Sequence, residues 1–347
     1  MTQSLSSETP AAGVSASGGH QWRLHVGFGL VALTWLICLL PTYLSLMDTW
    51  ARTGTFQFGF LIFPVCAVLI WSRRAWLARL VARPEPRALW LAAALSGIWL
   101  LGALMHINLA QHLAAVAIWP VWIYLFYGRA VARVLGFPMG YVLFAVPFGN
   151  FMVGPLQTVT AHLAVFSLHL VGMPVLMDGH FIETPAAAWH VATACSGIKF
   201  FVATTAFGVL YAWIFYTSLN RRLIFIACSM IVPIIANGLR VFFTILIGEH
   251  FGIQYATGTD HVIFGWQFFG SVLVLLFFAG WPFHQAPTPM VVPATPARPA
   301  RIGQIMRVTV AGLLVTIVPA LVVTLVSQFM PNLVLDLAQL LGQAGNS

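Results

Sequence analysis

The sequence predicts an all-α, polytopic transmembrane helical bundle, with about eight core spans, one interfacial helix and one C-terminal span. Of its 347 residues, 60% are hydrophobic and only 7% are charged, so lipid must be the solvent for much of the apolar surface. The apolar runs are long and continuous, whereas a membrane β-barrel would show short segments of alternating hydrophobicity. Arginine residues fall in alternate connections between these runs, which is typical of a protein that crosses the bilayer repeatedly.

Nine apolar runs are each about long enough to cross a bilayer, which takes about 20 residues with some tolerance for tilt. We expect the first eight to form the core and the last to form a separate C-terminal span. The runs cover residues 24–47, 56–71, 89–105, 113–127, 134–148, 198–219, 223–248, 262–281 and 308–327.

Most basic residues lie in connections that the positive-inside rule assigns to the cytoplasm, together with the N-terminus. The net charge of +8 is therefore mainly a consequence of topology and does not indicate nucleic-acid binding. These residues are Arg23, Arg73, Arg74, Arg79, Arg83, Arg87, Arg129, Arg133, Arg221, Arg222, Arg298, Arg301 and Arg307.

Residues 134–148 and 156–171 cannot both cross the membrane. If both crossed, Cys195 would face the cytoplasm and the next helix could not return Arg221 and Arg222 to the inside. We expect 134–148 to cross and 156–171 to form an interfacial or re-entrant helix on the outer face, because the second segment is more polar. Its polar residues are Gln157, Thr158, Thr160, His162 and His169.

The predicted domain organisation has four parts. Residues 1–22 form a disordered cytoplasmic tail, 23–283 the main transmembrane domain, 284–307 a Pro-rich cytoplasmic linker, and 308–347 a C-terminal transmembrane helix with a short outer tail. The first apolar run is too long for a signal peptide. The sequence has no glycine-rich phosphate loop and no Cys or His pair at zinc spacing, so we expect neither a cofactor nor a metal.

Cys195, in the stretch VATACSGIKF, is the one cysteine expected at an outer interface. It precedes a predicted helix, with Ser196 available as an N-cap and Gly197 leaving the backbone approachable. The helix N-terminus and Lys199 would both favour the thiolate over the thiol. Position alone leaves two interpretations open: a nucleophile, or an inert filler of the kind expected for Cys38, Cys66 and Cys228 within apolar runs.

Arg240, in the stretch NGLRV, lies well inside the apolar run 223–248. At 1.5 Å per residue it is about 26 Å from the cytoplasmic end, near the outer leaflet. An ionised side chain there costs about 3 kcal/mol or more unless it snorkels or is paired. Asn237, Arg240 and Thr244 recur at helical spacing and form a polar stripe, which favours a place in the bundle interior, with snorkelling as the alternative.

His261 stands just after an outer loop and beside Asp260, with Gly265 one helical turn later. Three consecutive helices would thus bring Cys195, Arg240 and His261 to the outer leaflet. These three residues, at the same depth in the membrane, could together carry out acyl transfer. The cysteine thiolate would attack, the histidine imidazole would exchange protons, and the arginine guanidinium would stabilise the oxyanion. The alternative is three unrelated interfacial polar residues.

The motifs VATACSGIKF, NGLRV and DHVIFGW, preceded by FAVPFGN and GMPVLMDGHFIETP, together resemble the exosortase/archaeosortase family of polytopic transpeptidases. The resemblance covers about residues 134–281 in the family's order and spacing. Residues 24–127 are similar only in hydropathy, and the tail from His284 onward lies outside the pattern.

The resemblance implies that Cys195 is the nucleophile, Arg240 the oxyanion-stabilising or substrate-orienting residue, and His261 the acid and base. Ser196, Gly197 and Asn237 are expected to support them.

It further implies a cysteine protease or transpeptidase that cleaves C-terminal sorting signals, similar to PEP-CTERM signals, at the periplasmic face of a bacterial inner membrane, in association with exopolysaccharide production. The implied partners are membrane-anchored substrate proteins and the lipid bilayer, with no nucleic acid and no cofactor. Two other classes stay open. A transporter would be expected to show symmetry between two halves, which the sequence lacks, and a non-enzymatic factor in exopolysaccharide export needs no nucleophile.

Overall fold

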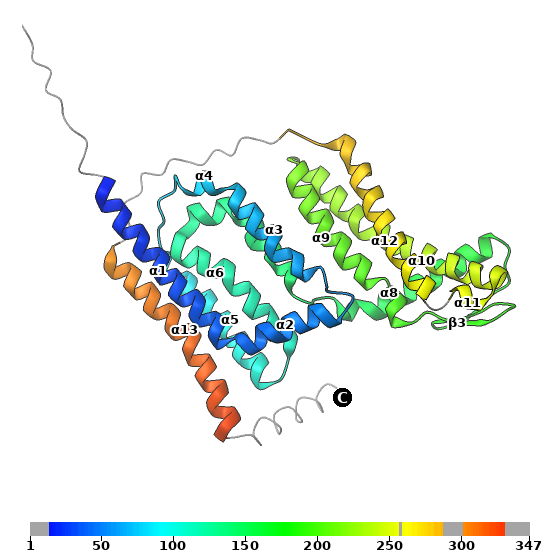
Figure 1. The fold of residues 1–347 in the computed structure, drawn as a ribbon, viewed down its shortest axis with the longest axis horizontal. Helices are drawn as coiled ribbons and strands as arrows, with labels where there is room; N and C mark the ends of the chain where they lie inside the picture. Colours follow the sequence, from blue (N-terminus) through cyan, green and yellow to red (C-terminus); the bar gives the residue numbers. More distant parts are fainter. Residues whose placement is uncertain (1–13, 257–258, 287–300, 330–347) are drawn as a thin grey trace, which may run out of the picture. The chain divides into compact units, whose positions relative to one another are not determined.

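The computed structural model describes residues 14–256, 259–286 and 301–329, of which 14–20 and 259–264 are described by their backbone alone. These residues are almost entirely helical, with three short strands (Figure 1), so the predicted all-α helical bundle is confirmed. The chain divides into two compact units. One is made of segments within Met1–Thr49, Gly59–Pro147 and Val291–Ser347, and the other of Trp50–Phe58 and Phe148–Met290.

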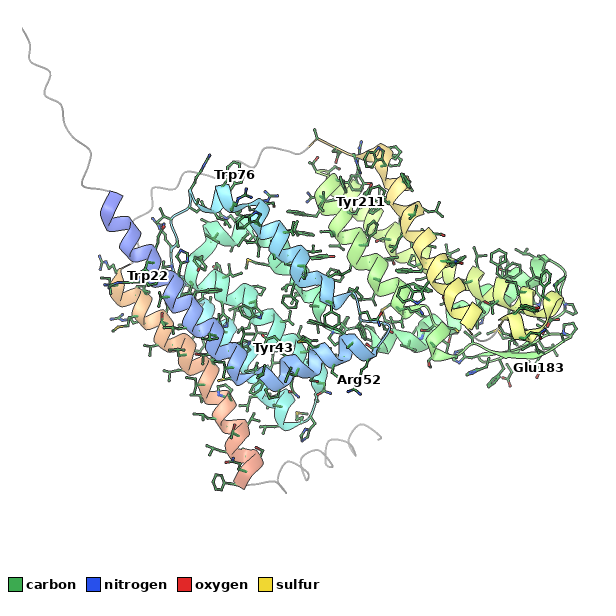
Figure 2. The ribbon with its side chains drawn as sticks, viewed as in Figure 1. Trp22, Tyr43, Arg52, Trp76, Glu183 and Tyr211 are labelled. Atoms are coloured by element: carbon green, nitrogen blue, oxygen red, sulfur yellow. The ribbon has the colours of Figure 1, made fainter. Side chains whose placement is uncertain are left out.

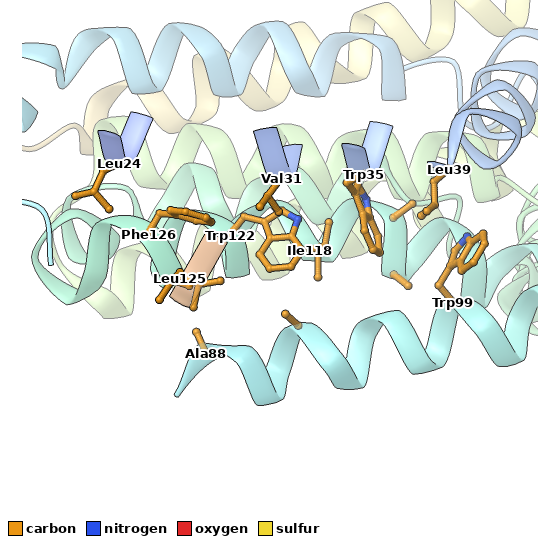
Figure 3. Packing of buried hydrophobic residues seen from close by; sticks show 14 of the residues in the cluster. Leu24, Val31, Trp35, Leu39, Ala88, Trp99, Ile118, Trp122, Leu125 and Phe126 are labelled. Carbon is orange, nitrogen blue, oxygen red and sulfur yellow. The ribbon is translucent and has the colours of Figure 1, made fainter. Parts of the chain in front are cut away.

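The first unit is held together by a core of large apolar side chains between its helices. Trp35 and Trp122 meet edge to face, with ring centroids 6.2 Å apart, and both are fully buried (Figure 3). A Cβ at Gly27 would lie 2.4 Å from Thr309 Oγ1, so this glycine lets the C-terminal helix approach the first helix closely. The elements are α1 (Val14–Cys38), α2 (Leu40–Arg52), α3 (Gly59–Ser72), α4 (Arg74–Leu77), α5 (Ala88–Leu104), α6 (Asn108–Val134), α7 (Gly136–Tyr141), η1 (Val142–Ala145) and α13 (Ile302–Phe329).

The second unit is organised around one long helix, α10, which packs against α8, α9 and α12. Its three strands form a small antiparallel sheet in the order β1-β2-β3, and Ile182 of the middle strand is buried in a cluster with residues of α8 and α10. The elements are η2 (Asn150–Met152), α8 (Val153–Leu170), β1 (Leu176–Asp178), β2 (Phe181–Glu183), β3 (Ala188–His190), η3 (Thr193–Cys195), α9 (Ile198–Phe215), α10 (Leu219–Phe251), α11 (Ile253–Ala256), α12 (Thr259–Gly280) and η4 (Trp281–Phe283).

Fewer helices than the nine expected are long and apolar enough to span a membrane. The described residues contain six such helices, or seven if the bent pair α1 and α2 is one span. That pair, which covers the run 24–47, bends by 69° close to Pro41, which lies in the first turn of α2, where proline is best tolerated in a helix. The runs 56–71 and 89–105 form the shorter helices α3 and α5.

The run 134–148, which we expected to cross, forms only the short helical stretch Gly136–Ala145. Gly136, Pro138 and Gly140 lie within this stretch, and glycine and proline both weaken a continuous helix. By contrast, Asn150–Leu170 has the length and composition of a span. By length and composition, the segment that we expected to be interfacial is therefore the better candidate for a span, the reverse of our assignment.

The contacts of α8 show where it lies along α10. Thr160 is bonded to Asn237, and a Cβ at Gly238 would lie 2.6 Å from Leu163 Cβ. The two helices run in the same direction, because residues later in α8 cluster with residues later in α10. Thr160 lies seven residues after the start of α8 at Val153, so α8 begins about 10 Å before Asn237 along α10, in the first half of that helix. Its interfacial placement on the outer face stays a prediction.

The helix ends differ slightly from the predicted domain limits. The first helix begins at Val14, within the expected tail 1–22, and α13 begins at Ile302, within the expected linker 284–307. Both helices therefore extend beyond their apolar runs on the side where we expect the cytoplasm.

Candidate active site

Cys195 ends the short helix η3 directly before α9, and its side chain is half-buried. Gly197 takes the N-cap position of α9 with φ of +82°, a left-handed conformation that favours glycine. A Cβ there would also lie 2.7 Å from the Asn237 amide. The expected N-cap role of Ser196 is therefore wrong, and its buried Oγ instead accepts a hydrogen bond of 3.4 Å from the Ile198 N–H.

Arg240 is turned into the protein, with only 3% of its surface exposed. Its guanidinium interacts electrostatically with the Cys195 side chain, and its Cζ lies 5.3 Å from the centre of the Phe200 ring. Position 265 of α12 is a glycine, where a Cβ would lie 3.0 Å from Arg240 Nη1. Since the side chain is enclosed by α9, α10 and α12, the polar stripe points into the bundle and the snorkelling alternative does not describe this residue.

The backbone around Cys195 is held by amide and hydroxyl groups of α8 and α10. Asn237 Nδ2 donates to the Cys195 carbonyl at 2.8 Å and to Thr160 Oγ1 at 3.0 Å. Thr160 Oγ1 in turn donates to the Ser196 carbonyl at 3.4 Å, and Gln157 Nε2 donates to the Val191 carbonyl at 2.5 Å. Asn237, Thr160 and Gln157 are all buried, so these bonds are made away from water and fix the loop strongly.

Sequence reasoning did not assign Gln157 and Thr160 to the site. Both belong to the polar set that predicted an outer-face helix, and their spacing of three residues puts them on one face of that helix. The spacing of Gln157 and Thr160 indicates that they share one face of α8. It does not indicate that this face contacts the loop before α9, because that contact joins segments that are distant in sequence.

A second cation stands beside the thiol. Lys199 interacts electrostatically with both Arg240 and Cys195, and its Nζ lies 5.1 Å from the centre of the Phe200 ring. No carboxylate contacts Arg240 in the part of the chain that the structure describes. The site is therefore positively charged around the sulfur.

The position of His261 relative to Cys195 stays a prediction, because its side chain lies outside the described residues. Its backbone belongs to α12, four residues before Gly265, the residue that faces Arg240. Within the described ranges, no three His, Cys, Asp or Glu side chains come together as metal ligands.

The three strands lie in the connection between α8 and α9, which contacts the last turns of α10. Trp189 Nε1 donates to Thr184 Oγ1 at 2.9 Å, and the Thr184 hydroxyl bonds to Glu249 near the end of α10. A Cβ at Gly248 would overlap the Trp189 ring, so the glycine permits this close contact. Glu183, which precedes Thr184, lies in the part of the second unit that carries the strands (Figure 2). The connection between α8 and α9 is thus anchored to α10.

Substituting Gly197 by alanine is expected to destabilise the site. The new residue would have to keep φ of +82°, which costs about 1–2 kcal/mol for a residue with a Cβ, and its Cβ would displace Asn237. Thermal unfolding of the purified protein in detergent should show a lower midpoint. Gly154→Ala is the matched control, because a Cβ at Gly154 meets nothing within 4 Å. Equal midpoints for both variants would contradict the tight fit at Gly197.

Comparison with protein families agrees with the motif resemblance. A family model described as transmembrane exosortase (Exosortase_EpsH) matches residues 50–278, a region that contains Cys195, Arg240 and His261. No curated protein and no solved structure matches the chain. Because the matched region covers more than half of the chain, and the described helices include at least six of spanning length, this multi-pass membrane protein belongs to the transmembrane exosortase family.

Proposed function

We propose that this exosortase is a membrane-embedded cysteine protease or transpeptidase that removes C-terminal sorting signals, similar to PEP-CTERM signals, from exported proteins. The observation that carries the proposal is the burial of the Arg240 guanidinium beside the Cys195 side chain, with which it interacts electrostatically. A buried cation is costly without a counter-charge, and among the described residues no carboxylate contacts Arg240, so its charge would be available to an anion. The thiolate and the oxyanion of acyl transfer are such anions.

The proposed reaction has two stages. The Cys195 thiolate attacks the carbonyl carbon of the scissile peptide bond, and Arg240 stabilises the negative oxygen of the tetrahedral intermediate. The carbon–nitrogen bond then breaks, His261 gives a proton to the leaving amine, and a thioester joins the substrate to Cys195. Water or an amine acceptor attacks this thioester while His261 takes up a proton, and the thiolate is released for another cycle.

The position of Cys195 along α10 suits a substrate that is anchored in the membrane by its own helix. Cys195 is bonded to Asn237, which is about 27 Å along α10 from the end that carries Arg221 and Arg222. The positive-inside rule places those arginines in the cytoplasm, so the thiol would lie near the outer boundary, at the periplasmic face of a bacterial inner membrane. A substrate held by its own transmembrane helix would present its cleavage motif at this depth, which fixes orientation and raises the local concentration.

The fixed loop before α9 supports the same assignment. A nucleophile that is held by its own backbone loses less freedom when it reaches the transition state. The bonds from Asn237, Thr160 and Gln157 hold the carbonyl groups on both sides of the thiol, whereas an inert filler would need only apolar neighbours.

Capture of the covalent intermediate tests this function. The full chain is incubated in membranes with a tagged substrate that carries a short motif, an apolar helix and a basic cluster at its C-terminus. We expect mass spectrometry to find the shortened substrate attached to the peptide that contains Cys195, and hydroxylamine to release it, because a thioester is cleaved by this reagent. Cleaved substrate without any adduct on Cys195, or an adduct on another residue, would contradict the proposed mechanism.

A further inference from the structure

The first unit contains a cavity of about 560 Å³ that plays no part in the candidate active site. It lies between α1, α3, α4 and α6, and most of its wall is apolar. Four polar side chains complete the lining, namely those of Gln21, His25, Arg74 and Tyr127. The apolar wall comes from Leu24, Phe28, Ile70, Leu77, Ala78, Leu80, Ala82, Ile123, Val131 and Leu135.

The cavity opens beside the densest cluster of positive charge in the chain. Arg73, Arg74, Arg79, Arg83 and Arg87 all occur in the connection between α3 and α5. By the positive-inside rule this connection faces the cytoplasm, so the cavity lies at the level of the inner leaflet. The cavity combines a mainly apolar wall with the cationic side chain of Arg74. These features suit an amphiphile with a negatively charged headgroup.

One wall of the cavity is fixed in place before any ligand binds. The Arg83 N–H donates to the Tyr127 carbonyl at 3.2 Å, and the Glu85 N–H donates to the Leu125 carbonyl at 2.9 Å. Gly128 has φ of +78°, and a Cβ there would lie 2.1 Å from the Arg83 carbonyl oxygen. The segment that carries Leu80 and Ala82 is therefore held against α6. Because this wall is already ordered, binding a ligand would cost little conformational entropy.

Arg74 has unused capacity to bind an anion. Its Nη1 donates to the Trp71 carbonyl at 3.1 Å, and its Cζ lies 4.8 Å from the centre of the Trp71 ring. These contacts orient the guanidinium, which has five N–H groups in all, and no carboxylate contacts it among the described residues. Trp76 projects from α4 close by (Figure 2), and tryptophan is typical of the interfacial layer of a bilayer.

Uncharged polar side chains of α1 and α6 also line the cavity. His25 Nδ1 lies 2.9 Å from the Tyr127 hydroxyl, and Gln21 is in the same lining. Ester and glycerol oxygens of a lipid accept hydrogen bonds of this kind, while the phosphate prefers a guanidinium.

We propose that this cavity binds one anionic phospholipid of the inner leaflet, with an acyl chain against the apolar wall and the phosphate against Arg74. Basic pockets between transmembrane helices on the cytoplasmic side bind anionic headgroups by the same combination of charge and apolar contact. The proposal is independent of the catalytic roles of Cys195 and Arg240.

The first experiment measures headgroup selection. The full chain is reconstituted into phosphatidylcholine vesicles that contain a trace of phosphatidylglycerol or phosphatidylcholine with the same photoreactive acyl chain. We expect phosphatidylglycerol to label cavity-lining peptides of α1 and α6 more strongly than phosphatidylcholine, and Arg74→Gln to lower this labelling about fivefold. Arg87→Gln removes the same charge from the same connection but does not line the cavity, so it should retain most of the labelling.

The second experiment blocks the cavity without changing the charge. Ala78 lines the cavity and is exposed, so Ala78→Phe should place a ring at its wall and remove the labelling. Ala75→Phe is the matched control, because Ala75 is exposed in α4, three residues before Ala78, and does not line the cavity. Equal labelling by the two lipids, or labelling spread along α1 and unchanged by Ala78→Phe, would overturn the proposal.

Discussion

Replacement of Cys195 by alanine is expected to stop removal of a substrate's C-terminal anchor, with a loss of about 10⁴-fold or more, as when the nucleophile is removed from other acyl-transfer enzymes. Cys195→Ser should give nearly the same result, because a hydroxyl has far less anionic character than a thiol near neutral pH. The measurement is the size and membrane attachment of a tagged substrate produced together with the exosortase. Without acyl transfer, the substrate should keep its full length.

Cys228→Ala is the matched control for this experiment. Cys228 is an exposed cysteine of α10 in the same unit, and the substitution removes the same sulfur without touching the loop before α9. It should leave processing unchanged. If Cys195→Ala also left processing unchanged while the protein was inserted normally, the enzymatic proposal would be wrong, and a non-enzymatic membrane factor would be the better interpretation.

Replacement of Arg240 by lysine is expected to lower turnover by about 10² to 10³-fold, the usual effect of removing one oxyanion donor. Lysine keeps the positive charge but loses the planar fork of donors, and it must fill the space enclosed by Phe200 and Gly265. The rate of anchor removal measures this effect. Arg222→Lys is the control, because Arg222 belongs to the same helix and bonds to the Tyr216 carbonyl, away from the thiol.

Alkylation of Cys195 separates the role of Arg240 from that of His261. A membrane-impermeant maleimide is added from the outer side, and its rate of reaction is followed against pH. We expect His261→Ala to remove the dependence near neutral pH, because the imidazolium would no longer favour the thiolate, and Arg240→Lys to keep it. The opposite pattern would make Arg240 the activating cation. Reaction of Cys195 only from the cytoplasmic side would contradict its assignment to the periplasmic face.

The sequence by itself determined the class of the protein. A chain with 60% hydrophobic and 7% charged residues has to satisfy its backbone within helices if it lies in lipid, and the described structure is all-α. The motifs around Cys195, Arg240 and His261 were specific enough to indicate the family, and the family model covers all three. These properties depend on composition and local order, which require no knowledge of packing.

The sequence was less informative about the individual spans. Hydropathy counts apolar residues along the chain, so it treated 24–47 and 134–148 as continuous crossings. The first bends by 69° between α1 and α2, and the second breaks into short pieces. Whether a proline or glycine breaks a helix depends on which neighbouring groups can satisfy the freed backbone. That information belongs to the tertiary structure.

Only the tertiary structure decided which side chains meet at the thiol. Helical periodicity indicates the face of α10 that carries Asn237 and Arg240, but it does not fix how α8, α9 and α12 are rotated or shifted against that face. Close approaches at Gly197, Gly238 and Gly265 set these positions, because a Cβ at each would meet a neighbouring side chain. The electrostatic contact of Arg240 with the Cys195 side chain and the hydrogen bond from Asn237 to the Cys195 carbonyl follow from this packing.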